Sequence, residues 1–201
     1  GQANSTDLDY FLAGSPQHFA SFPAQTINYI ESHDDRCWID KITGNFRNNG
    51  QTPTAIDIRR THLAVALLYT ALGVPMLSAG QDMLRSKRGV NNTYQRGDLN
   101  ILEYERENEF PGTVKYVRDW IRFRQSDLGR LLRLKVHPTP ENLQFFHQDG
   151  SPALAMHLRD EHLQILFAIN PGEESADLQL PEAIPTLNFL ADEEHFLNNP
   201  E

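Results

Sequence analysis

Two apolar segments of this sequence run directly into polar side chains that could bind a ligand. Residues 27–31 (INYIE) are followed by SHDD at 32–35, and residues 74–77 (VPML) are followed by SAGQD at 78–82. Parallel strands of α/β folds place their ligands just beyond their carboxyl ends. If both segments are such strands, these side chains converge on one edge of a sheet, as at the rim of an active site. A turn that only caps a following helix is the alternative interpretation of SHDD.

The sequence between the two segments predicts the helix that connects them. A polar loop at 43–53 is dense in turn-forming residues, and Thr52-Pro53 at its end is typical of a helix start. Residues 56–72 keep apolar side chains at helical spacing, with Ile56, Leu63, Leu67 and Leu68 as the predicted core face, and Gly73 marks the stop. A strand, a long helix and a second strand form a βαβ unit, which implies parallel strands.

The remaining sequence divides near residue 130. Residues 85–100 form a polar loop of a length that is usually functional or disordered, and residues 113–125 have helical spacing. Beyond residue 131, short apolar runs separated by turn sequences are typical of antiparallel strands. The four runs are 143–148, 153–158, 163–170 and 175–180. The predicted fold class is therefore α/β followed by all-β.

The composition excludes several classes of function. The net charge of -9, from 18 basic and 27 acidic residues, argues against a general nucleic-acid binder and against binding to an anionic membrane surface. No apolar run approaches the roughly 20 residues that span a membrane. The single cysteine, Cys37, excludes an internal disulfide and a cysteine-rich zinc site. The chain begins without Met and is expected to be a cut one, so the lack of a targeting signal leaves the compartment open.

Other residues that could do chemistry have simpler interpretations. His147 and His157 lie on neighbouring predicted strands without a tight ligand cluster, so we expect no metal site. Cys37 lies near His33 in sequence, but we expect a packed thiol because nothing orients the two as nucleophile and base. Trp38 and Phe46 could line a sugar cleft or pack beneath the loop. The basic run at 85–88 is expected to be a solvated loop face.

The motifs around both predicted strands resemble those of a known family. NYIESHDD at 28–35, the run GVPMLSAGQDMLRSKRGVNNTY at 73–94 and DLNILEY at 98–104 resemble the carboxyl-terminal third of pullulanases and related starch-debranching enzymes of the α-amylase superfamily. The resemblance runs from Phe19 to Leu134 without large gaps. It implies that residues 1–130 hold the last two βα units of a (β/α)8 barrel, including strands seven and eight. Residues 131–201 resemble the small antiparallel β-sandwich that follows the barrel.

The resemblance implies roles for six residues. Asp34 would be the catalytic acid that stabilises the oxocarbenium-like transition state without being the nucleophile, since a fixed carboxylate in a dry pocket stabilises positive charge. His33 would hydrogen-bond sugar hydroxyls. Four residues of the long loop would contact substrate on the glycone side: Asn92, Tyr94, Asp98 and Asn100. Two departures stand out, because the family usually has Asn at the position of Asp35 and Glu at the position of Asp82. If Asp34 and Asp35 were both buried, the pKa of one would be raised.

Retaining enzymes of this family also need a nucleophilic Asp and an acid/base Glu on strands four and five, and no acid of this chain lies in a matching motif. We therefore expect a piece of an enzyme that cleaves α-1,6 branch links of pullulan, starch or glycogen and is inactive alone. The alternatives are a non-catalytic module that binds α-glucan or a partner chain, and a degenerate homologue. The expected partner is an α-glucan, with no cofactor except a possible calcium ion in the parent. Exposed strand edges could associate with other chains.

Overall fold

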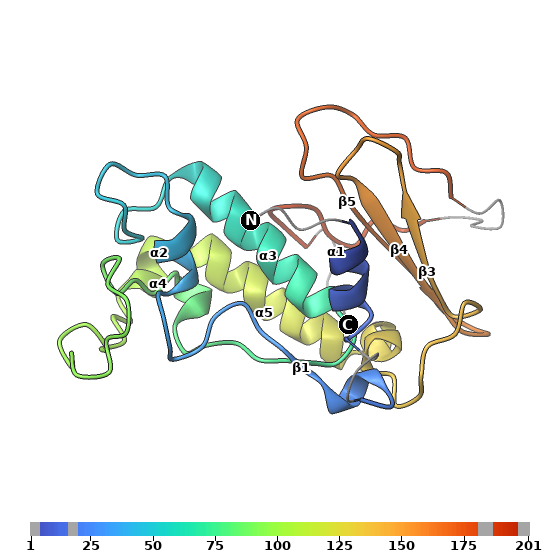
Figure 1. Ribbon diagram of the computed structural model, residues 1–201, viewed down its shortest axis with the longest axis horizontal. Coiled ribbons are helices and arrows are strands. Elements are labelled where there is room, and N and C mark those ends of the chain that lie inside the picture. The colour runs from blue at the N-terminus through green and yellow to red at the C-terminus, as the bar shows by residue number, and fades with distance from the viewer. Residues whose placement is uncertain (1–4, 16–19, 181–186, 197–201) are drawn as a thin grey trace. The chain divides into compact units, whose positions relative to one another are not determined.

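The computed structural model describes residues 5–15, 20–180 and 187–196 (Figure 1). The chain forms two compact units, each built from separate segments of sequence. The first unit comprises Gly1–Asn28, Thr70–Val74 and Arg124–Phe189. The second comprises Tyr29–Tyr69, Pro75–Phe123 and Leu190–Glu201. The division of the chain at residue 130 into a barrel part and a sandwich stays a prediction.

The first unit contains an antiparallel three-stranded sheet. Its strands are β3 (Leu143–His147), β4 (Leu154–Arg159) and β5 (Gln164–Ile169), and β4 lies in the centre. The central strand is buried over its first five residues, whereas both edge strands are only partly covered. Three of the four predicted strands are thus confirmed. The prediction for 175–180 is wrong: this segment is mostly exposed and forms no strand, and the backbone N–H of Asp177 donates to the side chain of Gln148.

The first unit also holds α1 (Ser5–Leu12), a 3-10 turn η1 (Pro23–Gln25), the strand β1 (Ile27–Asn28) and a 3-10 helix η3 (Leu128–Arg133). Strand β1 pairs with β2 (Val74–Pro75), where the Val74 N–H donates to the Thr26 carbonyl at 2.8 Å. Both strands are shorter than predicted. Residues 29–31 and 76–77, which were expected to extend the two strands, lie outside regular secondary structure.

Gly73 allows the chain to turn closely against β1. Its φ of 102° lies in the region that favours glycine, and a Cβ there would lie 2.6 Å from Thr26 Oγ1. The Asn28 side chain donates to the Leu72 carbonyl at 2.6 Å across the same turn. Helix α3 ends at Thr70, before the predicted stop at Gly73, and the turn that contains Gly73 joins this helix to β2.

The second unit is mainly helical. Its elements are α2 (Trp38–Ile42), α3 (Ala55–Thr70), the 3-10 turn η2 (Gln81–Met83), α4 (Arg106–Glu109) and α5 (Pro111–Gln125), with the last residues of α3 and α5 counted in the first unit. Helix α3 begins after Thr54 rather than at Thr52-Pro53. The Thr54 hydroxyl accepts from the Asp57 N–H at 3.2 Å and the Asp57 carboxylate accepts from the Thr54 N–H at 2.9 Å, which is a reciprocal cap.

The predicted core face of α3 is confirmed only in part. Leu68 is fully buried and Leu63 and Leu67 are partly buried, but Ile56 is 62% exposed, so its assignment to the core is wrong. In α5, Val117 and Trp120 are buried, as their spacing predicted. Helix α5 begins two residues earlier than expected because Pro111 occupies its first position, where a missing N–H costs nothing.

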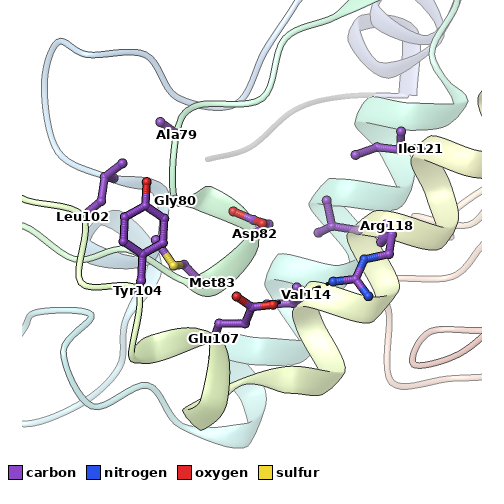
Figure 2. Close-up of a pocket in the computed structure, with 11 residues that line it drawn as sticks. Ala79, Gly80, Asp82, Met83, Leu102, Tyr104, Glu107, Val114, Arg118 and Ile121 are labelled. Carbon is purple, nitrogen blue, oxygen red and sulfur yellow. Dashed lines mark ion pairs between the residues drawn. The ribbon is translucent and has the colours of Figure 1, made fainter.

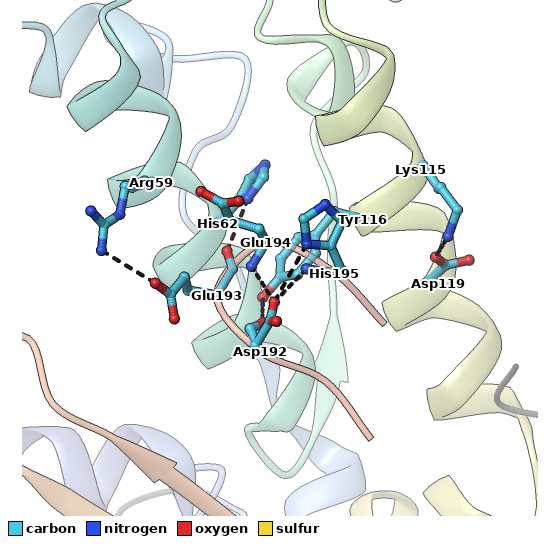
Figure 3. A network of polar contacts seen from close by, with 9 residues as sticks. All are labelled: Arg59, His62, Lys115, Tyr116, Asp119, Asp192, Glu193, Glu194 and His195. Atoms are coloured by element: carbon cyan, nitrogen blue, oxygen red, sulfur yellow. Dashed lines mark hydrogen bonds and ion pairs between the residues drawn. The ribbon is translucent and has the colours of Figure 1, made fainter. Parts of the chain in front are cut away.

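A polar network fixes the segment 190–196 to both helices (Figure 3). His62 of α3 stacks on Tyr116 of α5 with ring centroids 4.4 Å apart. Its Nδ1 donates to the Glu193 carbonyl at 3.1 Å, and its Nε2 lies 3.1 Å from the Thr113 hydroxyl. Phe196 contacts the aromatic rings of α5, including Trp120 at 5.0 Å. Because a carbonyl can only accept, Nδ1 carries the proton and the neutral ring accepts from Thr113.

His62 predicts a loss of stability in mild acid. Burial is the main cause that lowers the pKa of His62, opposed by the Glu193 carbonyl and by the charge of Glu194. As pH falls below about 6.5 the unfolded chain therefore binds a proton first, and the free energy of unfolding falls until the folded ring also titrates. Urea unfolding between pH 7.5 and 5 should show a smaller dependence on pH for His62→Gln than for the parent chain. Equal slopes would contradict this role.

Arg124 predicts a large loss of stability in the first unit. Its buried guanidinium donates to the carbonyls of Ala71 at 2.9 Å, of Leu132 at 3.0 Å and of Gly73. Arg124→Met leaves these carbonyls without their donor, so the free energy of unfolding should fall by about 3 kcal/mol. Arg122→Met on the same helix is the control, because its side chain is exposed, and should change stability by less than about 0.5 kcal/mol. A similar loss in both variants would rule the interpretation out.

Candidate functional site

The segment SHDD forms an exposed turn between β1 and α2. His33 Nε2 lies 3.6 Å from Asp34 Oδ1, and the two side chains are 91% and 74% exposed. The Ser32 hydroxyl accepts from the Asp34 N–H at 3.3 Å, which closes the turn locally. Helix α2 takes Cys37 as its N-cap residue and has no side-chain cap. The interpretation of SHDD as a helix cap is therefore wrong. Asp34 and Asp35 are both exposed, so the burial that would raise the pKa of one of them is absent.

Two buried charged residues hold this turn in place. Glu31, which is 3% exposed, accepts a hydrogen bond from the Trp38 N–H on the far side of the turn. Lys87, which is 2% exposed, donates from Nζ to the His33 carbonyl at 3.1 Å. Burial raises the pKa of Glu31, against the hydrogen bond from Trp38 and the nearby charge of Lys87. The backbone before and inside the turn is thus fixed, while the side chains of His33 and Asp34 extend into solvent.

Asp40 of α2 fixes Lys87 in turn. One carboxylate oxygen accepts from the Gly50 N–H at 2.6 Å and from the Ser86 hydroxyl at 2.6 Å. The other accepts from the Lys87 N–H at 2.7 Å. A fully buried carboxylate with three donors is stabilised as an anion by charge-assisted hydrogen bonds. It joins α2, the 43–53 loop and the start of the 85–100 loop.

Arg106 is a second buried cross-link of the same region. Its guanidinium donates to four backbone carbonyls, and its Cζ lies 5.0 Å from the centre of the Phe110 ring. The four acceptors are Gly50, Gln51, Met83 and Leu84. These carbonyls lie outside α-helices and strands, with Met83 at the end of the 3-10 turn η2, so the arginine supplies donors that regular secondary structure would otherwise provide.

The four predicted sugar contacts of the long loop lie in two settings. Asn100 is partly buried and reciprocally bonded to Thr93, at 2.7 Å to the hydroxyl and 2.6 Å to the carbonyl. Asp98 is paired with Arg96 at 2.7 and 2.8 Å on the surface. Asn92 and Tyr94 are exposed. In the described part of the chain, no hydrogen bond or ion pair joins these side chains to those of His33 or Asp34, and the connection between turn and loop runs through Lys87.

The competing candidates are resolved by their surroundings. Cys37 is buried, so the prediction of a packed thiol is confirmed. Burial, together with the charges of Glu31 and Asp40, raises the pKa of this thiol to about 11. Trp38 packs with its indole N–H donating to Thr61 at 3.2 Å, while Phe46 is 91% exposed.

The two strand histidines are bonded to other side chains. His147 pairs with Asp9 at 2.8 Å, and His157 bonds Gln164 at 3.0 Å. The described residues contain no group of three His, Cys, Asp or Glu side chains that could hold a metal ion. No helix within the same residues is long and apolar enough to cross a membrane.

The basic run 85–88 differs from its prediction. Arg88 is exposed, but Lys87 is buried and Arg85 is half-buried, with one guanidinium nitrogen donating to the Asn100 carbonyl at 2.9 Å. Sequence reasoning missed Lys87, Asp40 and Arg106, because each is recognised only by partners distant in sequence. The sequence offered two signals: the acid Asp40 near the start of the short segment that forms α2, and the basic run 85–88 next to apolar residues.

Asp40 gives a prediction about the rigidity of this region. In Asp40→Asn one oxygen becomes an NH2 group that faces an N–H or hydroxyl donor, so the free energy of unfolding should fall by about 2 kcal/mol, and amide hydrogen exchange at Lys87 should accelerate. Asp35→Asn is the matched control: position 35 has a φ of 58°, which Asn tolerates, and its side chain is exposed. Unchanged exchange at Lys87 in Asp40→Asn would show that another contact anchors the loop.

Comparisons with known proteins give a consistent result. No model of a known protein family matches the chain. It is 31% identical over 190 residues to the pullulanase of Bacillus subtilis strain 168, which covers 89% of this chain and 25% of that protein. The chain thus spans about a quarter of the length of this curated relative.

Solved structures show the same relationship. The crystal structure of pullulanase type I from Bacillus subtilis, complexed with maltose, aligns with a TM-score of 0.77 and 27% identity over 98% of this chain and 28% of that chain. A mutant pullulanase from Paenibacillus barengoltzii, complexed with maltotetraose, aligns with a TM-score of 0.77 and 26% identity over 92% of this chain and 30% of that chain. Over most of its length the chain is a homologue of pullulanases, consistent with a carboxyl-terminal part of a pullulanase-type glycoside hydrolase of the α-amylase superfamily.

Proposed function

We propose that this chain supplies one wall of the active site of a retaining glycoside hydrolase that cleaves α-1,6 branch links of α-glucans. The observation that carries the proposal is the homology to pullulanases across 89% of the chain. The solved relatives with maltose and maltotetraose support α-glucan as the ligand class. In this proposal β1 and β2 belong to the seventh and eighth strands of a (β/α)8 barrel, and the sheet β3–β5 to the sandwich that follows it.

Asp34 is the proposed transition-state acid. Cleavage of a glycosidic bond develops positive charge on the anomeric carbon, which a fixed carboxylate stabilises. The backbone of the turn is fixed by Glu31 and Lys87, while the Asp34 carboxylate itself is accessible to a ligand. His33, whose ring lies 3.6 Å from that carboxylate, is the proposed donor to sugar hydroxyls beside it.

The long loop is the proposed substrate wall. Tyr94 is 83% exposed and offers a ring on which a pyranose face can stack, and Asn92 offers an exposed amide. Asp98 and Asn100 already have protein partners, Arg96 and Thr93, so substrate hydroxyls would join these pairs rather than meet free side chains. Pairs of this kind hold the polar groups in one orientation before the sugar binds.

Hydrolysis also needs a nucleophilic carboxylate and an acid/base carboxylate. No acid of this chain lies in the motif of either, so the chain alone is proposed to be inactive. The reducing-sugar assay on pullulan should show no release with the isolated chain. In the parent enzyme, Asp34→Asn should lower kcat by at least about 10²-fold, because it removes charge stabilisation in the transition state. Asp35→Asn is the neighbouring control and should retain activity. Reducing-sugar release by the isolated chain that survives Asp34→Ala would overturn the proposal.

A further inference from the structure

A pocket of about 330 Å³ lies in the second unit, and none of the residues that line it is among those proposed for catalysis or substrate binding above (Figure 2). It is lined by the turn 79–83, the segment 102–107 and one face of α5. Its floor is apolar and buried, with Met83, Val114 and Val117 each at most 7% exposed. This volume is at the lower end of the range for small-molecule sites, which combine apolar walls with a few polar groups.

The polar groups of the pocket stand at its rim. Figure 2 shows the carboxylates of Asp82 and Glu107 between the Tyr104 ring on one side and the Arg118 guanidinium on the other. Glu107 and Arg118 form an ion pair at 3.8 Å, with both side chains about half exposed. Within the described part of the chain, the Asp82 carboxylate has no hydrogen bond or ion pair, although the residue is partly buried. The Asp82 carboxylate can therefore accept hydrogen bonds from a ligand in this largely apolar pocket.

The charges restrict the ligand class. Two carboxylates against one guanidinium give the rim an excess of one negative charge, which disfavours phosphates and carboxylates. Carboxylates supply acceptors and a guanidinium supplies donors side by side, which suits vicinal hydroxyl groups. The Tyr104 side chain is 66% exposed and its ring borders the cavity, where it offers an apolar face with a polar edge. A neutral ring with hydroxyls at its edge and C–H groups on its faces matches this arrangement.

We propose that this pocket is a binding site for a glucosyl unit of an α-glucan. Asp82 accepts from ring hydroxyls, Arg118 donates to a ring or hydroxyl oxygen, and the apolar floor takes a C–H face. The choice of glucose among neutral sugars rests on the proposed function. The pocket and its charges are observed in the structure and do not depend on that function. Because the groups belong to this chain, binding needs neither the nucleophile nor the acid/base of the parent enzyme.

The test is a titration of the 15N-labelled chain with maltotriose, followed by amide chemical shifts. Saturable shifts are expected at Gly80, Met83, Tyr104 and Val114. Asp82→Ala and Tyr104→Ala should each weaken this binding at least tenfold, and both change side chains that are not part of the buried core. Tyr94→Ala, which alters the proposed substrate loop, should leave binding at the pocket unchanged. Thermal unfolding of each variant checks that it remains folded.

Two results would overturn the proposal. One is the absence of saturable shifts at these residues, or shifts that Asp82→Ala and Tyr104→Ala leave unaltered. The other is tighter binding of ethanolamine than of maltotriose, which would assign the pocket to a cationic ligand. The pullulan assay with Asp34→Asn reports separately on the proposed function. Pocket shifts with normal activity of Asp34→Asn would reject the catalytic role alone, and loss of that activity without pocket shifts would reject the pocket alone.

Discussion

The buried carboxylate of Asp40 joins the segments from which the candidate site is built. An ionised carboxylate removed from water is costly unless donors surround it. Here the Gly50 N–H, the Ser86 hydroxyl and the Lys87 N–H supply them. The 85–100 loop therefore starts from a fixed point. From there the Lys87 amine reaches the His33 carbonyl, so the position of the proposed catalytic turn depends on a helix residue that has no direct contact with substrate in the proposed mechanism.

The same constraint explains how a long irregular segment keeps a defined path. Residues 84, 88 and 92 all have positive φ without being glycine, with values of 57°, 56° and 49°. Such conformations are disfavoured and persist only where surrounding contacts hold them. Arg106 holds the first of these residues by donating to the Leu84 carbonyl at 2.7 Å, and Asp40 accepts from the N–H of Lys87, next to Arg88. The start of the loop is therefore held by buried charged side chains rather than by a helix or a sheet.

Periodicity predicted what depends on local sequence, and it failed where distant partners decide. The helices α3 and α5 and the strands β3 to β5 follow from the spacing of apolar residues and from the turns between them. Strands β1 and β2 are shorter than the apolar segments that predicted them, because the length of a strand pair is set by the partner strand and not by local sequence alone. The buried Lys87 was taken for a solvated residue because its partners Asp40 and His33 lie 47 and 54 positions away. The roles proposed for Asp34 and the loop came from the family resemblance and not from the geometry.

The exposure of Asp34 limits what this chain can contribute to catalysis. Two unit charges 4 Å apart attract by only about 1 kcal/mol in bulk water, against about 4 kcal/mol at the effective dielectric of a protein surface site. With its side chain 74% exposed, the Asp34 carboxylate is close to the first case. Glu31 and Lys87 therefore position the turn that carries Asp34, but nothing in the described part of this chain excludes water from its carboxylate. A hydrolase built on this turn requires further walls around Asp34 as well as a nucleophile, since a solvated carboxylate stabilises an oxocarbenium ion weakly.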